Sequence, residues 1–463
     1  MTLTSTRAGK GEAYSAASTL DGSVLHQTTM LSPDQLTELA SAPAPIDSIY
    51  RSSDTLGAFL GRLADQLDRR REPLLHAMRH ETGFISRDCE EVFEGVTALL
   101  RGFCANDEQR AGVPPGEYRN GGRAIQLSSA PWGAVAVILP QNAFLYLAAT
   151  CLASALAAGN RVALRAPSQS ALSAMLLEDA IREAGIAEEM ATVVTAKSKE
   201  FVSAFQESEQ PGLIHYMGSS RHAPAILADT FQAGKASLID GDGNVIAYIG
   251  QSIAPEDAAA LLTQGAVRYN GQTCTSVNGA IIHPARYDAV RGALLRRWRS
   301  LTWGDTIASP DVSVGPLLSQ DQAHWCEQQI AQSGGTVLSG GKSHGNILEP
   351  TLLESPEPNS GLVREGLFGP ALWIASGDAE QFTQMWRGNK YPLCAAVIGA
   401  LEPTEWWLSR LPGAARLVID GDPSIEDIFE PWGGYLGSGA NPVSDWKSKY
   451  RRTLQIDIPV SRR

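Results

Sequence analysis

The chain has 463 residues, of which 43% are hydrophobic and 19% are charged. This length and composition predict a globular protein with two large domains, or two and a small appendage, and argue against disorder along the whole chain. The net charge of −12 disfavours nucleic acid as a partner, because an acidic surface repels phosphate groups. No apolar run is long enough for a membrane span, and the first residues lack the apolar core of a signal peptide. We therefore expect a cytoplasmic protein without membrane partners.

The six cysteines and eight histidines are scattered along the chain. Cysteines without paired spacing predict free thiols in a reducing compartment. No HExxH, CxxC or acidic cluster with ligand spacing occurs, so we expect no metal. The chain is polar and rich in small residues until about residue 30, and we expect that part to lack fixed structure.

Helical periodicity predicts two amphipathic helices over residues 54–104, with Pro73 near a helix start and Gly83 near a helix end. An extended ribbon that turns at Gly121-Gly122 is predicted over residues 117–130. The final segment, 450–460, also has strand character and stands apart from the preceding helices.

Buried strands alternate with helices through the rest of the chain. The first series of predicted strands lies at 132–140, 161–166, 191–196 and 213–217. A second series begins near residue 243, with strands at 244–250, 276–283, 336–341, 370–376, 395–400 and 415–421. Nearly continuous apolar strands separated by helices predict an α/β fold with parallel sheets covered by helices on both faces.

Cys274 is the cysteine placed for chemistry. It lies in RYNGQTCTSVNG, where Asn270 and Gly271 interrupt a helix before the next strand begins. A thiol on such a loop is exposed enough to react, although most cysteines are simply small buried hydrophobes. Thiolate is the nucleophilic form, so the loop would have to activate a group that titrates near about 8.5.

Two other sites follow predicted strands, at the edge where ligands collect in parallel sheets. Asn142 comes directly after the strand at 132–140, where its amide could donate to an oxyanion or cap the next helix. Gly218-Ser219-Ser220 forms a strand–turn–helix junction able to bind a pyrophosphate through backbone N–H groups. Each of these signals is weak when taken alone.

In order along the chain, these segments resemble the aldehyde dehydrogenase superfamily over roughly residues 50–460. The resemblance is carried by PWGAVAVILPQNAF, YMGSS, NGQTC, EGLFGPALWI, NKYPLCAAV and PWGGYLGSG. It implies a Rossmann-like cofactor-binding domain, an α/β catalytic domain and a small β oligomerisation ribbon. The implied boundaries are 1–108 with 132–242 for the cofactor domain, 243–440 for the catalytic domain, and 109–131 with 447–463 for the ribbon. The family habit is a homodimer or homotetramer.

The resemblance also assigns roles. Cys274 would attack a carbonyl carbon to form a thiohemiacetal and then a thioester, while Asn142 and the Cys274 backbone N–H hold the oxyanion. The substrate would be a small aldehyde or acyl thioester, and the cofactor NAD or NADP. The expected cofactor contacts are Pro140, Arg165, Ser168, Gly218, Ser219, Gly241, Gly243 and Phe368. Arg165 and Ser168, where a lysine and a glutamate are common, favour NADP over NAD.

Two departures from the family concern the fate of the thioester. Hydrolytic members carry a glutamate that activates water, but an ungapped count places Asp240 there and matching the next strand places Ile239 there. Gly366 stands where the family usually has a ribose-binding glutamate, with Glu365 only beside it. The segment 241–244 resembles the acylating branch, which transfers the acyl group to and from coenzyme A.

We therefore favour an acylating enzyme, with coenzyme A or a carrier-bound thiol as co-substrate. One alternative is a hydrolytic enzyme with Asp240 or Asp242 as an unusual base, which the PWGGYLGSG block supports. The other is a catalytically weakened scaffold or regulatory relative, against which the joint retention of Cys274 and Asn142 argues. Five side chains either line an apolar tunnel or belong to the core: Tyr146, Met217, Tyr269, Trp432 and Trp446.

Overall fold

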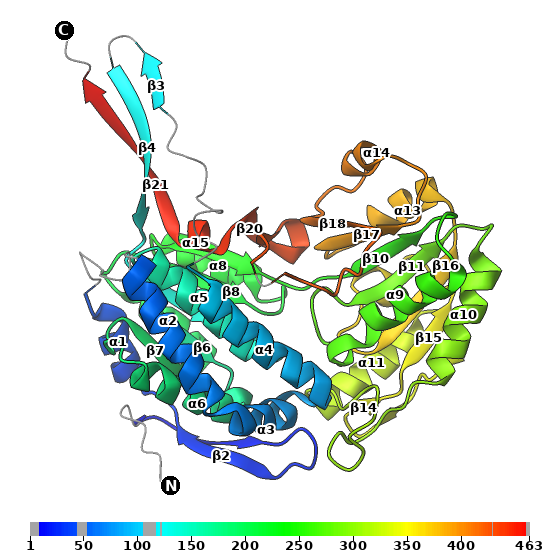
Figure 1. Cartoon of the computed structure of the whole chain (residues 1–463), viewed down its shortest axis with the longest axis horizontal. Coiled ribbons are helices and arrows are strands. Elements are labelled where there is room, and N and C mark those ends of the chain that lie inside the picture. Colours follow the sequence, from blue (N-terminus) through cyan, green and yellow to red (C-terminus); the bar gives the residue numbers. More distant parts are fainter. Residues whose placement is uncertain (1–8, 44–52, 105–116, 121–122, 428, 460–463) are drawn as a thin grey trace.

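The computed structural model describes residues 9–43, 53–104, 117–120, 123–427 and 429–459. Two seven-stranded sheets form the centres of two lobes that lie side by side (Figure 1). A three-stranded ribbon projects from the first lobe. We call the part built around β5–β9 the first lobe and the part built around β10–β18 the second lobe.

The sheet of the first lobe has the strand order β19-β20-β9-β8-β5-β6-β7. Its parallel strands are β5 (Ala134–Ile138), β6 (Arg161–Ala166), β7 (Ala191–Thr195), β8 (Gly212–Met217) and β9 (Ala236–Asp240). One face is covered by α2 (Ser53–Asp68), α3 (Arg71–Thr82), α4 (Ser86–Gly102), α5 (Phe144–Ala157) and α6 (Ala171–Glu183). The other face is covered by α1 (Pro33–Ser41) and α7 (Ser198–Glu207), and α8 (Ala223–Gln232) packs beside β9.

The sheet of the second lobe has the order β12-β15-β16-β11-β10-β17-β18. Its strands are β10 (Val245–Ile249), β11 (Val277–Ile282), β12 (Thr336–Ser339), β15 (Thr351–Glu354), β16 (Ala371–Ser376), β17 (Cys394–Ile398) and β18 (Arg416–Ile419). Helices α9 (Pro255–Val267) and α10 (Tyr287–Arg299) cover one face. The other face is covered by α11 (Gln320–Gln332), α12 (Gly361–Arg364), α13 (Ala379–Trp386) and α14 (Thr404–Leu408). Only the edge strand β12 is antiparallel, so the predicted parallel α/β class is confirmed.

The end of the chain returns to the first lobe. β19 (Trp432–Gly434) and β20 (Gly439–Ser444) join its sheet, where β20 pairs antiparallel with β9. β19 begins at Trp432, before residue 440, which the sequence predicted as the end of the catalytic domain. After α15 (Trp446–Lys449), β21 (Arg451–Pro459) pairs with β4 (Arg123–Pro131), which also pairs with β3 (Glu117–Asn120). The turn predicted at Gly121-Gly122 lies outside the described residues.

Two expectations were wrong. The described N-terminal residues are not loose, since β1 (Ala13–Ala17) and β2 (Val24–Thr29) form a hairpin. The hairpin is fixed to the first lobe because Ala16 is fully buried and Thr19 N donates to His80 O at 2.7 Å.

Residues 54–104 form three helices rather than two, because the first predicted helix divides into α2 and α3. Pro73 belongs in the first turn of α3, where its missing N–H costs nothing. Gly83, at φ +75°, ends α3 as predicted. Among the described residues, no helix is long and apolar enough to cross a membrane.

Candidate active site

The predicted site residues of the first lobe gather at one edge of its sheet. Asn142 follows β5, Arg165 is near the end of β6, and Gly218 follows β8. Because these strands are parallel and adjacent, their carboxyl ends lie together. Leu139 N donates to Arg165 O at 3.1 Å, and Gly218 N donates to Asp240 O at 3.0 Å, so backbone hydrogen bonds continue the alignment beyond the strands. This edge faces the second lobe (Figure 1).

The loop that carries Cys274 is held in an uncommon backbone conformation. Tyr269 and Asn270 have φ of +53° and +56°, and Gly271 has φ +67°. Asn is one of the few side chains that tolerate this region. The buried Asn270 amide donates to Gly83 O at 2.9 Å and to Pro316 O at 3.0 Å. It therefore ties the loop to the end of α3 in the first lobe and to a loop of the second lobe.

Cys274 itself is half-buried. Gly243 packs against it so closely that a Cβ at Gly243 would overlap the Cys274 carbonyl oxygen. Burial raises the pKa of the Cys274 thiol well above its ordinary value, and the nearby carboxylates Glu426, Asp240 and Asp242 raise that pKa further. The resting group is therefore a thiol, and it must lose a proton before it can act as a nucleophile.

Asn142 lies beside the loop that carries Cys274. Its Nδ2 donates to Gln272 O at 2.8 Å, two residues before Cys274. An amide nitrogen has two hydrogens, so one remains for a second acceptor. The alternative role as a helix cap is not observed, because α5 begins at Phe144 after Ala143, without a side-chain cap.

The turn after β8 is joined to the segment after β9. Ser220 N donates to Asp242 Oδ2 at 2.8 Å, and Asp242 N donates to Ser220 Oγ at 2.8 Å. A Cβ at Gly241 would overlap Ser220 Oγ, which explains a glycine at that position. Ser219 is exposed at the surface of this turn. The expected cofactor residues Gly218, Ser219 and Gly241 thus form one structural unit.

The remaining expected cofactor residues lie apart from this turn. Arg165 is half-buried and donates from Nε to Ala196 O at 2.9 Å, and burial lowers its pKa to about 10. In the part of the chain that the structure describes, no carboxylate lies within ion-pair distance of its guanidinium. Ser168 begins η3 (Ser168–Ser170) just beyond β6, and Pro140 follows β5. Phe368 is partly exposed in the second lobe, after α12.

Gly366 explains one departure from the family pattern. Its φ of +75° lies in the region that favours glycine. A Cβ there would lie 2.8 Å from Asn244 Oδ1, so the space of a side chain is already filled. Its neighbour Glu365 points elsewhere, since Lys390 Nζ pairs with it at 3.1 Å on the surface.

Both carboxylates predicted as possible bases are engaged in other contacts. His215 Nε2 lies 2.6 Å from Asp240 Oδ2, and Asn441 Nδ2 donates to both Asp240 oxygens at 3.0 and 2.9 Å. Asp242 accepts from the Ser220 N–H and, at 3.4 Å, from the Ser219 hydroxyl. Both oxygens of Asp240 therefore accept hydrogen bonds that join β8, β9 and β20, whereas the hydrogen bonds of Asp242 involve its Oδ2.

Glu426 is a carboxylate near Cys274 that the sequence reasoning missed. It lies in the connection from β18 to β19, and its negative charge raises the pKa of the Cys274 thiol. Burial raises the pKa of Glu426. The sequence gives no signal for Glu426. Its loop has no motif, and nothing in its pattern predicts which part of the fold the loop approaches.

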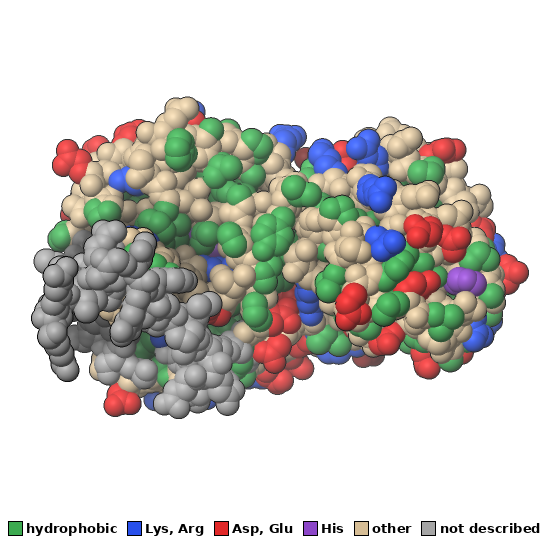
Figure 2. Space-filling model, turned by 90° about the horizontal axis from the view of Figure 1, so that it is seen from above, with side chains coloured by type: hydrophobic (Ala, Val, Ile, Leu, Met, Phe, Trp, Pro, Cys, Tyr) green, Lys and Arg blue, Asp and Glu red, His purple; other side chains and the backbone are tan. Residues whose placement is uncertain are grey.

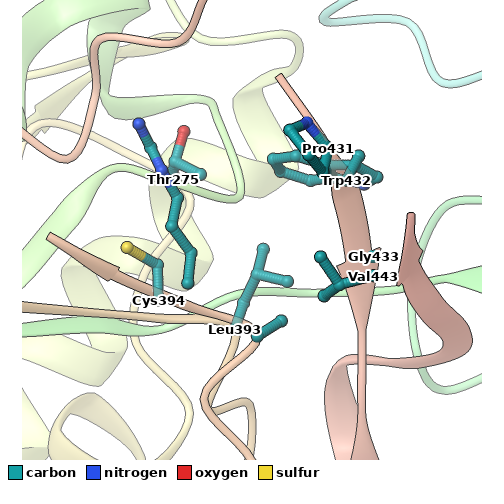
Figure 3. Close-up of a pocket in the computed structure, with 9 residues that line it drawn as sticks. Thr275, Leu393, Cys394, Pro431, Trp432, Gly433 and Val443 are labelled. Atoms are coloured by element: carbon teal, nitrogen blue, oxygen red, sulfur yellow. The ribbon is translucent and has the colours of Figure 1, made fainter. Parts of the chain in front are cut away.

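The aromatic side chains singled out in the sequence take different places. Tyr146 and Tyr269 are partly buried against the core of the first lobe, close enough to Glu426 for its charge to raise the pKa of both phenols. Met217 is buried in that core, and Trp446 packs against it. Trp432 lines a pocket of about the size of one water molecule (Figure 3). Thr275, which follows Cys274, borders the same pocket on the side facing Trp432.

Charged side chains of both signs are interspersed on the face shown in Figure 2, without a continuous basic patch there. Within the described ranges, no group of three or more His, Cys, Asp or Glu side chains is placed to hold a metal ion. The described cysteines are all free thiols.

Comparisons with known proteins point to one family. The family model described as "Aldehyde dehydrogenase family" matches residues 50–457. An alpha-ketoglutarate semialdehyde dehydrogenase from Haloferax volcanii is 27% identical over 323 residues, 67% of this chain and 66% of that protein. A 3-sulfolactaldehyde dehydrogenase from Priestia aryabhattai is 28% identical over 393 residues, 82% of this chain and 80% of that protein. The matched part is thus slightly less than two thirds of the first relative.

Solved structures share the fold. An aldehyde dehydrogenase from Brucella melitensis matches with a TM-score of 0.89 and 20% identity, over 98% of this chain and 95% of that chain. Glyceraldehyde-3-phosphate dehydrogenase GapN from Methanocaldococcus jannaschii, in complex with NADP, matches with a TM-score of 0.84 and 20% identity. That match covers 96% of this chain and 98% of the GapN chain.

Proposed function

The chain belongs to the aldehyde dehydrogenase family, and from that membership we propose that it is an NAD(P)-dependent aldehyde oxidoreductase with Cys274 as its covalent nucleophile. The observation that carries the proposal is the junction of Cys274 and Asn142. The half-buried thiol lies two residues from the carbonyl that Asn142 holds at 2.8 Å, at the edge of the sheet where a dinucleotide would bind.

The chain's own residues would divide the work as follows. Deprotonated Cys274 attacks the aldehyde carbon, and the oxygen of that carbon takes up negative charge. The second hydrogen of the Asn142 amide and a backbone N–H at the nucleophile stabilise that oxygen. NAD(P), when bound, supplies the acceptor for hydride. The turn of Gly218 and Ser219 is suited to the pyrophosphate because its backbone is exposed and its neighbours are fixed by Asp242.

NADP is favoured over NAD because Arg165 has no carboxylate partner among the described residues and Ser168 adds no negative charge beside it. A cation without a paired anion can take a 2′-phosphate, whereas a carboxylate would repel it. Comparison of KM for the two cofactors in the wild type and in Arg165→Gln tests this. A selective rise in the KM for NADP supports the assignment.

The experiment that tests the function follows NAD(P)H with a panel of small aldehydes, and with acyl-coenzyme A in the reverse direction. The acylating reaction remains a second candidate. It is favoured because position 240 carries an aspartate where hydrolytic members have a glutamate, and because the Asp240 carboxylate oxygens already accept hydrogen bonds from His215 and Asn441. A requirement for coenzyme A supports that candidate, and oxidation of free aldehyde without it supports hydrolysis. Full activity in Cys274→Ala contradicts covalent catalysis, and no turnover with any substrate supports a scaffold role.

The ribbon of β3, β4 and β21 is proposed as the oligomerisation element, since its three strands extend beyond the first lobe (Figure 1). Light scattering after size exclusion gives the number of subunits in the intact protein, and the same measurement after deletion of the β21 residues tests the role of the ribbon.

A further inference from the structure

The C-terminal end of α3 lies where the two lobes meet (Figure 1). A helix leaves its last carbonyl groups without partners inside the helix, so other segments must supply hydrogen-bond donors. Here each carbonyl oxygen of residues 80–83 accepts a hydrogen bond from outside α3. The donors, in that order, are the Thr19 backbone N–H and the side-chain amides of Gln141, Gln272 and Asn270. The end of α3 is therefore a row of acceptors for three amide side chains.

Gln141 fixes the loop that carries the expected oxyanion donor. Its Nε2 donates to Glu81 O at 2.7 Å, and the next residue along the chain is Asn142. The Glu81 side chain is itself held, because its carboxyl group accepts from the N–H groups of Leu172 and Ser173 at the start of α6. Gln141 thus attaches the backbone at Asn142 to a part of the first lobe that α3 and α6 hold in place.

Gln272 fixes the loop that carries Cys274, and it is completely buried. Its side chain bonds to both lobes, since Nε2 donates to Thr82 O at 3.4 Å and Oε1 accepts from Leu318 N at 2.9 Å. Its backbone carbonyl is the group that accepts from Asn142 Nδ2 at 2.8 Å. Gln272 therefore holds the loop in place and also supplies the acceptor that directs the Asn142 amide.

The two glutamines bind consecutive carbonyl groups of α3, so they hold the two loops side by side. A donor that stabilises an oxyanion must point to the place where the charge develops, and a displacement of about 1 Å can cost about 100-fold in rate. With one Nδ2 hydrogen of Asn142 on Gln272 O, the direction of the other hydrogen is set by the position of the two loops.

We propose that Gln141 and Gln272 are positioning residues, which place the Asn142 amide so that it stabilises an oxyanion formed at Cys274. The proposal rests on the proposed function of Cys274 and Asn142. It predicts that loss of either glutamine side chain weakens oxyanion stabilisation more than it weakens the reactivity of the thiol.

Two reagents separate these effects in the intact protein, and neither needs NAD(P). With 4-nitrophenyl acetate, the Cys274 thiolate adds to the carbonyl carbon, the carbonyl oxygen takes up the negative charge, and 4-nitrophenolate then leaves. With iodoacetamide, the same thiolate displaces iodide from a methylene carbon, and no charge develops on oxygen. Both rates at Cys274 are followed by mass spectrometry with peptide mapping at one pH. The ratio of acetylation to alkylation reports the oxyanion donors, because ionisation of the thiol and access to it affect both rates.

We expect Asn142→Ala to lower this ratio about 100-fold, because one donor to the oxyanion is lost. Gln141→Met and Gln272→Met keep the length of the side chain and remove its hydrogen bonds, and each should lower the ratio about tenfold. The double variant of Asn142→Ala and Gln141→Met should have the ratio of Asn142→Ala alone, because Gln141 acts through Asn142. A merely structural role would lower both rates together and leave the ratio unchanged.

Gln206→Met is the matched control. Gln206 is half-buried like Gln141 and also donates from Nε2, to Thr230 Oγ1 at 3.0 Å, but it lies in α7 on the opposite face of the sheet. We expect the wild-type ratio in this variant. A wild-type ratio in Gln141→Met or in folded Gln272→Met overturns the proposal. Urea unfolding shows whether Gln272→Met is folded, and the decision passes to Gln141→Met alone where it is not.

Failure of the proposed function has a different signature. Cys274 is then not acetylated in the wild type, or Cys274→Ala is acetylated equally, or Asn142→Ala has the wild-type ratio. Any of these results removes the oxyanion that the glutamines would serve. A wild-type ratio that is confined to the glutamine variants overturns the positioning role and leaves the proposed function intact.

Discussion

Glu81 is a carboxyl group almost completely buried beneath the start of α6, at 2% exposure. Its Oε1 accepts from Leu172 N at 2.9 Å and Ser173 N at 3.1 Å, and its Oε2 lies 2.5 Å from the Ser173 hydroxyl. Burial raises the pKa of Glu81 from 4.5 to about 7 and outweighs these three hydrogen bonds. Folding therefore favours the protonated form.

The sign of the pH dependence follows from that shift. When the folded pKa lies above the unfolded one, the contribution to stability is complete below about pH 4.5 and is lost as the pH rises to about 7. The difference between those values, at 1.36 kcal/mol for each unit, corresponds to about 3 kcal/mol. Glu81→Gln should remove this loss, because Oε1 can still accept from both backbone N–H groups and the amide can donate to Ser173.

The assay compares urea unfolding of the two proteins at pH 5 and pH 8, at equal concentration. Both proteins carry the same other titratable groups. The difference between their free energies of unfolding at each pH therefore isolates the titration of Glu81. We expect nearly equal stability at pH 5 and an advantage of up to about 3 kcal/mol for Glu81→Gln at pH 8. The N-terminus of α6 opposes the effect of burial, because the positive end of the helix dipole stabilises an ionised Glu81. If that effect dominates, Glu81→Gln is the less stable protein at pH 8, and the reasoning is refuted.

Three further predictions concern the loop that carries Cys274. Alkylation of Cys274 by iodoacetamide should accelerate about tenfold for each pH unit to beyond pH 9, because only the thiolate reacts and burial raises the thiol pKa. Gly243→Ala should lower aldehyde oxidation about 100-fold, measured as NAD(P)H formation, because its Cβ must displace the Cys274 carbonyl. Asn270→Ala should lower the free energy of unfolding by about 3–5 kcal/mol in urea, because the buried partners Gly83 O, Gly315 N and Pro316 O lose their hydrogen bonds.

Each of these has a contrary outcome. An alkylation rate that levels off near pH 7 would show that the thiol is activated in the resting protein. Unchanged turnover in Gly243→Ala would mean that the loop can move without misplacing Cys274. Wild-type stability in Asn270→Ala would mean that Gly83 O, Gly315 N and Pro316 O find other hydrogen-bond partners.

Local patterns were sufficient to predict most elements. The apolar runs at β5, β6 and β8 predict buried parallel strands, and Gly83, at φ +75°, ends a helix where expected. The N-terminal hairpin could not be predicted, because its stability comes from contacts with the first lobe rather than from its own composition.

The site was predictable only in part. Cys274 and Asn142 stand in motifs, and the structure brings them together. Asp240 looked available because its partners, His215 and Asn441, are distant in sequence, and Asn441 meets it only through the antiparallel pairing of β20 with β9. Glu426 was not considered because its loop has no periodic pattern, and because the sequence does not show that this loop approaches Cys274.

The pairing of β20 with β9, and of β21 with β4, has a consequence for biosynthesis. The edge of the first sheet and the hydrogen bonds of Asp240 both depend on residues 432–459, which are made after the second lobe. The same is true of the buried Tyr450, whose hydroxyl lies 2.8 Å from His215 Nδ1. Until those residues have left the ribosome, the sheet of the first lobe lacks β19 and β20, so its edge beside β9 stays open while the second lobe is being made.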